Sequence, residues 1–157
     1  MKPWLRGGFY QGSGDSDSKD GKHGTFFSVL PTVRIYAKFP YFNLMNINDA
    51  FAQLVLTPTA STKVNIDYHH LTLAETSDLF YAGAGATSRN TFGVAGRAPT
   101  GSGTLGELVD ITFNYVMNKH FNVTAYYAHA FGGQYEDTFY AQQRDADYAY
   151  VEFMTAF

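Results

Sequence analysis

The chain lacks cysteine entirely and is poor in charge. None of its 157 residues is Cys, which excludes disulfide frameworks, thiolate zinc sites and cysteine nucleophiles. Charged residues make up 16% of the chain, against about 25% in typical soluble domains. The 11 basic and 14 acidic residues give a formal charge of -3, and the bases form no stripe. Nucleic acid is therefore not an expected partner.

Long apolar runs and a secretion signal are also missing. No window approaches the roughly 18 consecutive apolar residues that a membrane-spanning helix needs. The first residues, Met1–Gly7, contain no apolar stretch followed by small residues, so they do not resemble a cleavable signal. Two interpretations stay open, a cytosolic protein or a trimmed or partial chain.

Aromatic residues are abundant instead. The chain has 14 Phe, 12 Tyr and 1 Trp, and aromatic residues reach 17%. Apolar residues recur with a period of two in short runs, separated by Gly, Asn, Ser and Pro, which is typical of β-strands. The sequence therefore predicts an all-β fold. Six strands are expected, at Trp4–Gly12, Asp49–Thr57, Lys63–Leu73, Glu107–Met117, Phe121–Ala130 and Asp147–Phe157.

The connections between these strands alternate in length. Short turns are expected at Pro58–Thr62 and Asn118–His120, and long loops at about 13–46, 75–106 and 131–146. Strands of about 9–11 residues, with short turns at one end and long loops at the other, are typical of outer-membrane barrels. The sequence thus predicts an antiparallel transmembrane β-barrel that contacts lipid of the bacterial outer membrane.

The last strand carries a further sign of this location. Because the expected strands are antiparallel and even in number, Phe157 lies at the edge of the short turns, which is expected to face the periplasm. A terminal aromatic residue that closes an alternating strand resembles the signal by which barrels are recognised for insertion. The barrel-insertion machinery is therefore an expected partner.

The side chains of the fourth strand separate by polarity. Val109 and Ile111 share one face, whereas Asp110 and Thr112 share the other. An apolar face against lipid and a polar lumen produce this pattern, but a soluble antiparallel sheet alternates as well. The polar faces mix Asn, Asp, Thr, Tyr and His with little Lys, which favours a wet lumen over bulk solvent. The alternative is a soluble antiparallel β protein that binds carbohydrate on an aromatic face.

Polar residues at the inward positions are the candidate pore lining. Their alternative role is a structural network in which buried polar groups satisfy one another. These candidates are Lys63, Asn65, Asp67, His69, Asp110, Asn114, Tyr126 and Glu152.

A second group of candidates lies in the first long loop. Arg34, Tyr36 and Lys38 alternate along an extended segment, so their side chains share one face at a spacing of about 6.6 Å. Two cations with an aromatic ring between them suit the carboxylates and rings of a uronate chain. The alternative is an ordinary loop surface with exposed bases.

Signatures of catalysis or of a cofactor site are not evident. His69 and His70 are adjacent on a strand and point to opposite faces, so they cannot share a metal ion. The run Gly83–Thr87 is not followed by the Lys of a phosphate-binding loop. A nucleophile elbow is also missing, and so is a carboxylate pair beside an apolar wall. We expect no enzymatic activity, no metal and no cofactor.

Five motifs follow one another along nearly the whole chain. They are DGKHGTFF at Asp20–Phe27, LPTVRIYAKFPYFNLMN at Leu30–Asn46, DLFYAGAGAT at Asp78–Thr87, FGVAGR at Phe92–Arg97 and YYAHAFGG at Tyr126–Gly133. In this order they resemble the alginate-export family of bacterial outer-membrane porins.

This resemblance implies an eighteen-stranded barrel that carries anionic polysaccharide across the outer membrane. Residues 1–157 would form about six C-terminal strands of that barrel domain, and six strands cannot enclose a lumen alone, because about eight is the smallest closed number. The implied solute is an anionic polysaccharide or a small acidic solute that passes without a cofactor.

The sequence departs from the family at one place. Alginate exporters resemble one another in an arginine-rich constriction, yet the inward residues of the fifth expected strand, Thr124, Tyr126 and Ala128, include no Arg. Looser relatives, which act as general porins or carry other acidic sugars, fit at least as well.

Overall fold

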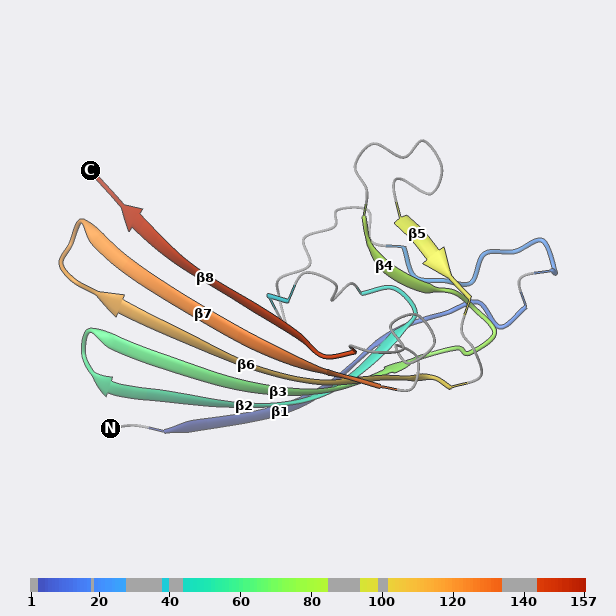
Figure 1. Ribbon diagram of the computed structural model, residues 1–157, viewed down its shortest axis with the longest axis horizontal. Helices are drawn as coiled ribbons and strands as arrows, with labels where there is room; N and C mark the ends of the chain where they lie inside the picture. Colours follow the sequence, from blue (N-terminus) through green and yellow to red (C-terminus); the bar gives the residue numbers. More distant parts are fainter. Residues whose placement is uncertain are drawn as a thin grey trace.

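The computed structural model describes residues 3–17, 19–27, 38–39, 44–84, 94–98, 102–133 and 144–157. Six strands form one curved antiparallel sheet in the order β1-β2-β3-β6-β7-β8 (Figure 1). The predicted all-β, antiparallel architecture is confirmed. β1 and β8 are the two edges of this sheet, which is not closed into a barrel. The strands are β1 (Trp4–Gly12), β2 (Ile47–Thr59), β3 (Thr62–Leu73), β6 (Thr104–Val116), β7 (Phe121–Gly132) and β8 (Ala146–Thr155).

Two further strands lie in the connection between β3 and β6. β4 (Phe80–Ala84) and β5 (Val94–Arg97) pair with each other in a separate antiparallel sheet. They are five and four residues long and rich in Gly and Ala, so their sequence shows little of the alternation and bulk that marks a strand. For this reason the sequence predicted only a loop here. No helix in the described part of the chain is long and apolar enough to cross a membrane.

Each of the six predicted strands exists, and the boundaries differ where the pairing is irregular. β2 continues past Pro58 to Thr59, although the pairing shifts between Leu56 and Thr59. Proline has no N–H to donate to the ladder, which explains an irregular pairing at this point. β2 therefore includes Pro58, which the sequence assigned to the turn.

β6 begins three residues earlier than Glu107 because of a bulge. The register with β3 shifts between Leu71 and Thr72, opposite Gly106. Gly106 has a φ of 140°, and a Cβ at this position would lie 2.2 Å from the carbonyl oxygen of Phe131. Only glycine suits this backbone, which lets β6 continue to Thr104 across an irregularity that alternation cannot reveal.

The short turns and the long connections lie at opposite ends of the strands. Figure 1 shows both chain ends beside the β2-β3 and β6-β7 turns, and the long connections at the other end. The backbone N–H of Ala156 donates to the carbonyl of His120, 3.0 Å away. The end of the chain thus lies against a short turn, as the antiparallel order predicts.

The outer face of the sheet is the apolar one. One lateral row crosses it through Leu54, Ile66, Ile111, Tyr127 and Ala149. Large apolar side chains on this face stay exposed, among them Val151 at 60% and Phe153 at 74%. An exposed apolar surface of this extent is typical of a face that contacts lipid or a partner.

The inner face carries the polar side chains. Its corresponding row contains Gln53, Asp67, Asp110, Ala128 and Tyr148. Because side chains alternate along every strand, the common register places these residues on the same side of all five strands. The predicted separation of polar and apolar faces is thereby confirmed.

Close to the long connections, the inner face is covered by an apolar core. Phe39 and Phe80, from two different connections, pack there with Leu71, Leu108 and Ala128 of the sheet. Leu108 is 1% exposed, and burying such a side chain contributes about 1.5–3 kcal/mol. Described residues of two long connections thus cover part of the inner face.

Asp78 joins two of these connections. Its carboxylate accepts hydrogen bonds from the backbone N–H of Asp15 at 2.9 Å, the hydroxyl of Thr25 at 2.6 Å and the hydroxyl of Tyr81 at 3.0 Å. Burial raises the pKa of Tyr81, and the Asp78 carboxylate adds to the rise, so this hydroxyl stays protonated and donates. A single buried carboxylate therefore holds three segments together.

We predict that Asp78→Ala loosens the long connections and leaves the sheet intact. The change leaves three buried donors without their acceptor, at about 1–3 kcal/mol each. Local opening should rise at least about tenfold, since 1.4 kcal/mol corresponds to a factor of ten. Limited proteolysis of the folded protein measures it as faster cleavage in the connections.

The matched control is Asp20→Ala, which removes an exposed carboxylate that accepts a hydrogen bond from the N–H of Lys22. Its cleavage rate should stay near that of the parent protein. Equal rates for the two variants would contradict the role of Asp78.

Candidate functional site

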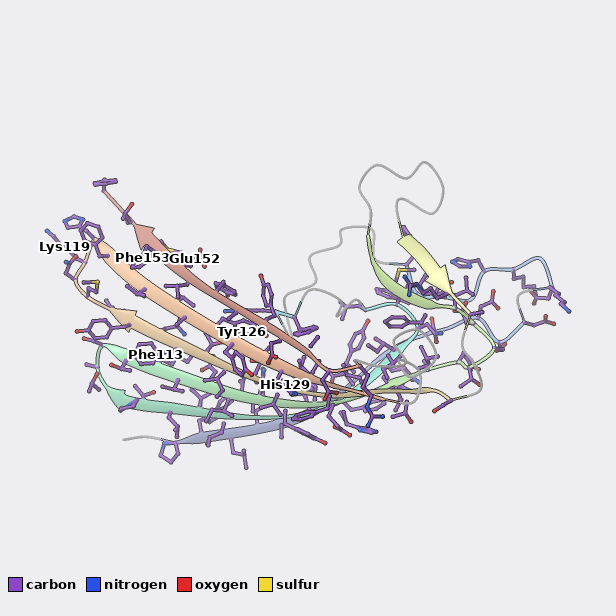
Figure 2. All side chains as sticks on the ribbon, in the orientation of Figure 1. Phe113, Lys119, Tyr126, His129, Glu152 and Phe153 are labelled. Atoms are coloured by element: carbon purple, nitrogen blue, oxygen red, sulfur yellow. The ribbon has the colours of Figure 1, made fainter. Side chains whose placement is uncertain are left out.

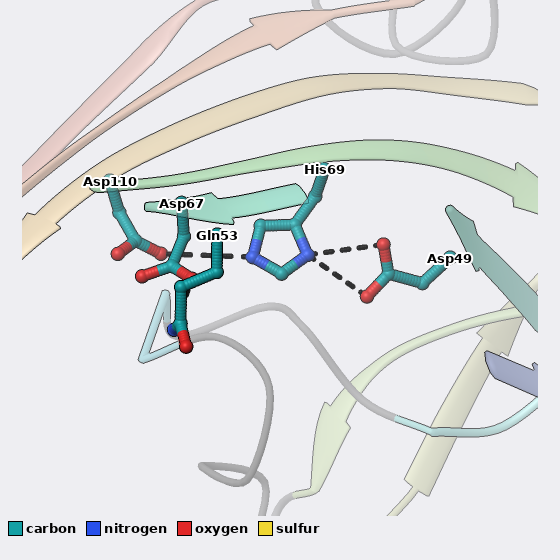
Figure 3. A network of polar contacts seen from close by, with 5 residues as sticks. All are labelled: Asp49, Gln53, Asp67, His69 and Asp110. Carbon is teal, nitrogen blue, oxygen red and sulfur yellow. Dashed lines mark hydrogen bonds and ion pairs between the residues drawn. The ribbon is translucent and has the colours of Figure 1, made fainter. Parts of the chain in front are cut away.

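A buried contact between a histidine and an aspartate lies on the inner face, between β2 and β3. The Nδ1 atom of His69 is 2.9 Å and 3.1 Å from the two carboxylate oxygens of Asp49 (Figure 3). His69 is 1% exposed and Asp49 is not exposed at all. Alternation brings both side chains to the inner face, because their strands pair Phe51 with His69 and Asp49 with Leu71. The contact is therefore diagonal across the strand pair.

Two more carboxylates continue this network toward β6. Asp67 and Asp110 face each other in the register of β3 and β6. Asp67 accepts a hydrogen bond from the amide of Gln53 on the neighbouring strand. The Nε2 atom of His69 lies 4.0 Å from Asp110 Oδ2. Figure 3 shows the five side chains as one continuous group across three strands.

Lys38 brings a positive charge from the first long connection to this network. Its ammonium lies 5.5 Å from the ring centre of Tyr126 and 5.8 Å from that of Tyr150. These two rings are stacked, with centres 5.2 Å apart. Phe39 packs edge-on against Tyr148 at 6.3 Å. Cation-π contacts of this kind fix an ammonium over an aromatic surface, so Lys38 is held on the inner face.

The acids and the bases of the site differ in their access to solvent. Among the described residues of the inner face, three carboxylates are buried and the fourth, that of Glu152, is exposed. The buried carboxylates are Asp49, Asp67 and Asp110. The bases that are exposed or half-buried are Arg6, Lys38 and Lys63. The accessible charge of this surface is consequently positive, which suits an acidic ligand.

The remaining candidates lie on the same face, nearer the short turns. Asn65 lies within β3, and the hydroxyl of Thr124 donates to the amide oxygen of Asn114 at 2.9 Å. Lys63 and Glu152 belong to the same lateral row but are separated by β6 and β7. Three strand spacings amount to about 14 Å. The structure therefore does not bring these two charges together.

Two of the sequence candidates, Arg34 and Tyr36, lie outside the described residues. Three residues of the site were missed, namely Arg6, Asp49 and Gln53. The alternation of β2 already placed Asp49 and Gln53 on its polar face, and this signal could have found them. Arg6 belongs to a Gly-rich strand of weak alternation, and its place opposite Gln53 follows only from the register of β1 with β2.

His69 and His70 have separate partners, as their adjacency predicted. His69 pairs with Asp49 on the inner face, whereas His70 pairs with Glu107 on the outer face at 2.7 Å. Within the part of the chain that the structure describes, no group of three or more His, Cys, Asp or Glu side chains could hold a metal ion.

We predict that Asp49→Ala destabilises the sheet strongly. Removing one partner of a buried pair leaves His69 without its carboxylate and lowers the free energy of unfolding by about 3–5 kcal/mol. Urea unfolding of the protein in detergent micelles measures this loss. Asp147→Ala, which removes the 63% exposed partner of His129, is the control and should cost no more than about 1 kcal/mol. Equal losses would contradict the importance of the buried pair.

Comparison with known proteins gives one match. The family model described as "Alginate export" matches residues 1–152. No curated protein and no solved structure matches the chain. The family match covers almost the whole chain, in agreement with the all-β antiparallel sheet and its separated faces. The chain therefore belongs to the alginate export family.

Proposed function

We propose that the inner face of this sheet lines a pore through which anionic polysaccharide or small acidic solutes pass passively. Membership of the alginate export family supports a role as an outer-membrane export channel. The choice of solute is our proposal. The observation that carries it is the contrast between three buried carboxylates and the exposed or half-buried bases of the inner face.

The charge arrangement supports an acidic solute for an electrostatic reason. The carboxylate of Asp49 is occupied by its contact with His69, and Asp67 lies within electrostatic reach of both Arg6 and Lys38. A buried carboxylate such as Asp67 attracts a nearby base. The base is the more exposed of the two groups, so it lies nearer to the solute than the carboxylate does. The field that a passing polyanion meets is then dominated by the bases, and attraction raises its local concentration.

The outer face favours this channel over a soluble carbohydrate-binding sheet. Ile111 and Phe113 are each 40% exposed in the middle of the sheet. In a soluble sheet, such side chains would face water without cover. In a barrel they face the hydrocarbon region of the bilayer, where apolar side chains are favoured.

Lys38 is the residue that we place closest to the path of the solute. It reaches the inner face from a connection rather than from a strand, so it projects above the wall formed by Tyr126 and Tyr150. A loop that folds onto the inner wall narrows a pore at that level. A solute that passes this level would meet the ammonium of Lys38 beside two aromatic rings.

The absence of arginine on β7 bears on the solute. Its inward residues Thr124, Tyr126 and Ala128 provide no positive charge. The bases of the inner face come instead from β1, β3 and the first connection. We therefore assign the channel to acidic solutes as a class and not to alginate alone.

The orientation of the sheet in the membrane is also a proposal. We place the short turns in the periplasm and the long connections outside, following the general layout of outer-membrane barrels. Since the chain contains no Cys, single-cysteine variants give an unambiguous test. In intact cells, Ser102→Cys should react with a membrane-impermeant maleimide and Asn118→Cys should not. The reverse pattern would overturn the orientation.

We predict that Lys38→Gln lowers the preference of the channel for anions. One unit charge at about 10 Å in water contributes about 0.4 kcal/mol, which is about a twofold change in local ion concentration. The ratio of anion to cation permeability should therefore fall by about a factor of two. Reversal potentials across planar bilayers with a salt gradient measure this ratio. The effect should fade at high salt, where screening shortens to about 3 Å at 1 M.

Two variants serve as matched controls for this measurement. Lys119→Gln removes one positive charge from the turn between β6 and β7 (Figure 2). The ratio of anion to cation permeability should change much less in this variant. Glu152→Gln removes the accessible acid of the inner face, and the ratio should rise. If Lys38→Gln and Lys119→Gln gave the same ratio as the parent, Lys38 would have no part in solute selection.

A further inference from the structure

A second cluster of a base with aromatic rings lies on the inner face, on β1 and β2. The guanidinium carbon of Arg6 lies 5.8 Å from the ring centre of Trp4 and 5.3 Å from that of Phe51. Trp4 and Arg6 are two residues apart on β1, so both side chains point to the inner face, where Arg6 is opposite Gln53. We call Trp4, Arg6 and Phe51 the β1 cluster.

A glycine of β1 makes room for the ring of Phe51. Gly8 is directly opposite Phe51 in the register of β1 and β2. A Cβ at Gly8 would lie 2.5 Å from the ring atom Cζ of Phe51, so any side chain at this position would force the ring to move. Because Gly8 has no side chain, the ring extends across the backbone of β1 and stays within reach of Arg6. Two neighbouring strands thus build this cluster together.

The β1 cluster is accessible and combines two kinds of surface. Trp4 is 54% exposed, Arg6 is exposed and Phe51 is half-buried. The indole of Trp4 offers a flat apolar surface with one N–H donor at its edge. The guanidinium of Arg6 is planar and fits a carboxylate with two parallel hydrogen bonds. An apolar platform and a positive charge are therefore available side by side.

The rings that contact Lys38 belong to the same lateral row as Trp4. This row consists of Trp4, Val55, Asn65, Thr112, Tyr126 and Tyr150. Lys38 rests beside Tyr126 and Tyr150 as Arg6 rests beside Trp4. Because the strands of a barrel tilt by about 40°, a lateral row climbs the wall by about 3 Å from one strand to the next. A polymer that moves through the pore therefore meets the two clusters one after the other.

We propose that the β1 cluster is a subsite for one acidic sugar of a passing polysaccharide, whose pyranose ring stacks on Trp4 and whose carboxylate binds Arg6. This assignment rests on the proposed channel function. The faces of a pyranose ring carry C–H groups, which pack on an aromatic ring as other apolar groups do. A carboxylate attached to that ring then reaches the guanidinium beside the indole. A small acid without a sugar ring binds Arg6 alone, so the subsite favours acidic saccharides over other anions.

The fluorescence of Trp4 tests this subsite, because Trp4 is the only tryptophan of residues 1–157. The protein in detergent micelles is titrated with hexagalacturonate, maltohexaose or citrate, and the emission of Trp4→Phe is subtracted. We expect hexagalacturonate to change the emission saturably. Its dissociation constant should be about tenfold lower than those of maltohexaose, which lacks the carboxylates, and of citrate, which lacks the sugar rings. One hydrogen bond to a charged group supports a difference of this size.

Four variants separate stacking from charge. Arg6→Gln should raise the dissociation constant of hexagalacturonate about tenfold and leave that of maltohexaose unchanged. Gly8→Ala, which displaces the ring of Phe51 from Arg6, should weaken hexagalacturonate about threefold, as the loss of one exposed cation-π contact predicts. In calorimetry, Trp4→Ala should weaken both hexasaccharides and leave citrate unchanged. Phe9→Ala is the matched control, because it removes a 65% exposed ring from the outer face of the same strand, and all three ligands should bind as to the parent.

Three results would overturn the subsite. They are an emission of Trp4 that does not respond to hexagalacturonate, equal dissociation constants for hexagalacturonate and citrate, and unchanged binding of both hexasaccharides to Trp4→Ala. Failure of the proposed channel function has a different sign, namely a permeability ratio that Lys38→Gln leaves unchanged. A channel that selects anions while Trp4 gives no response would contradict the subsite alone.

Discussion

Continuous antiparallel pairing with a constant side-chain alternation is the constraint on which the rest of this structure depends. In a bilayer every backbone N–H and C=O needs a partner within the protein, so neighbouring strands pair along most of their length. The register between neighbours then decides which side chains share a face. A slip of one residue between β3 and β6 would turn Asp110 toward lipid and Ile111 toward the inner side. Such a slip is disfavoured on both faces, because polar side chains would meet lipid and apolar side chains would meet the polar inner side.

The inner face combines two environments along the same strands. Near the long connections it is covered by an apolar core that includes Phe39 and Phe80, and nearer the turns it is open and polar. The Asp49–His69 pair lies at the boundary between the two parts, fully buried and yet charged or polar. The two hydrogen-bonded contacts between His69 Nδ1 and the Asp49 carboxylate offset part of the cost of burying both groups. Asp78 in turn joins described parts of two long connections at this end of the sheet.

The same imidazole chemistry serves different purposes on the two faces. His69 is buried on the inner face, where its partner Asp49 compensates for the loss of water. His70 and His129 stand beside exposed carboxylates at the rim of the apolar surface, where Tyr hydroxyls complete each group. Exposed ion pairs contribute little to stability. These outer pairs are therefore expected to contribute less to the stability of the sheet than the buried pair of Asp49 and His69.

The sequence by itself determined the strands, their alternation and the contrast between short and long connections, because a period of two is a local property of neighbouring residues. It also placed His69 and His70 on opposite faces. The sequence could not determine the register of the strands, because register depends on pairing between distant segments. Only the tertiary structure decided that Arg6 lies opposite Gln53, that Asp67 faces Asp110, and that the bulge at Gly106 extends β6. It alone decided that Lys38 leaves its loop to rest on Tyr126 and Tyr150, because only a folded sheet presents two stacked rings to an ammonium group.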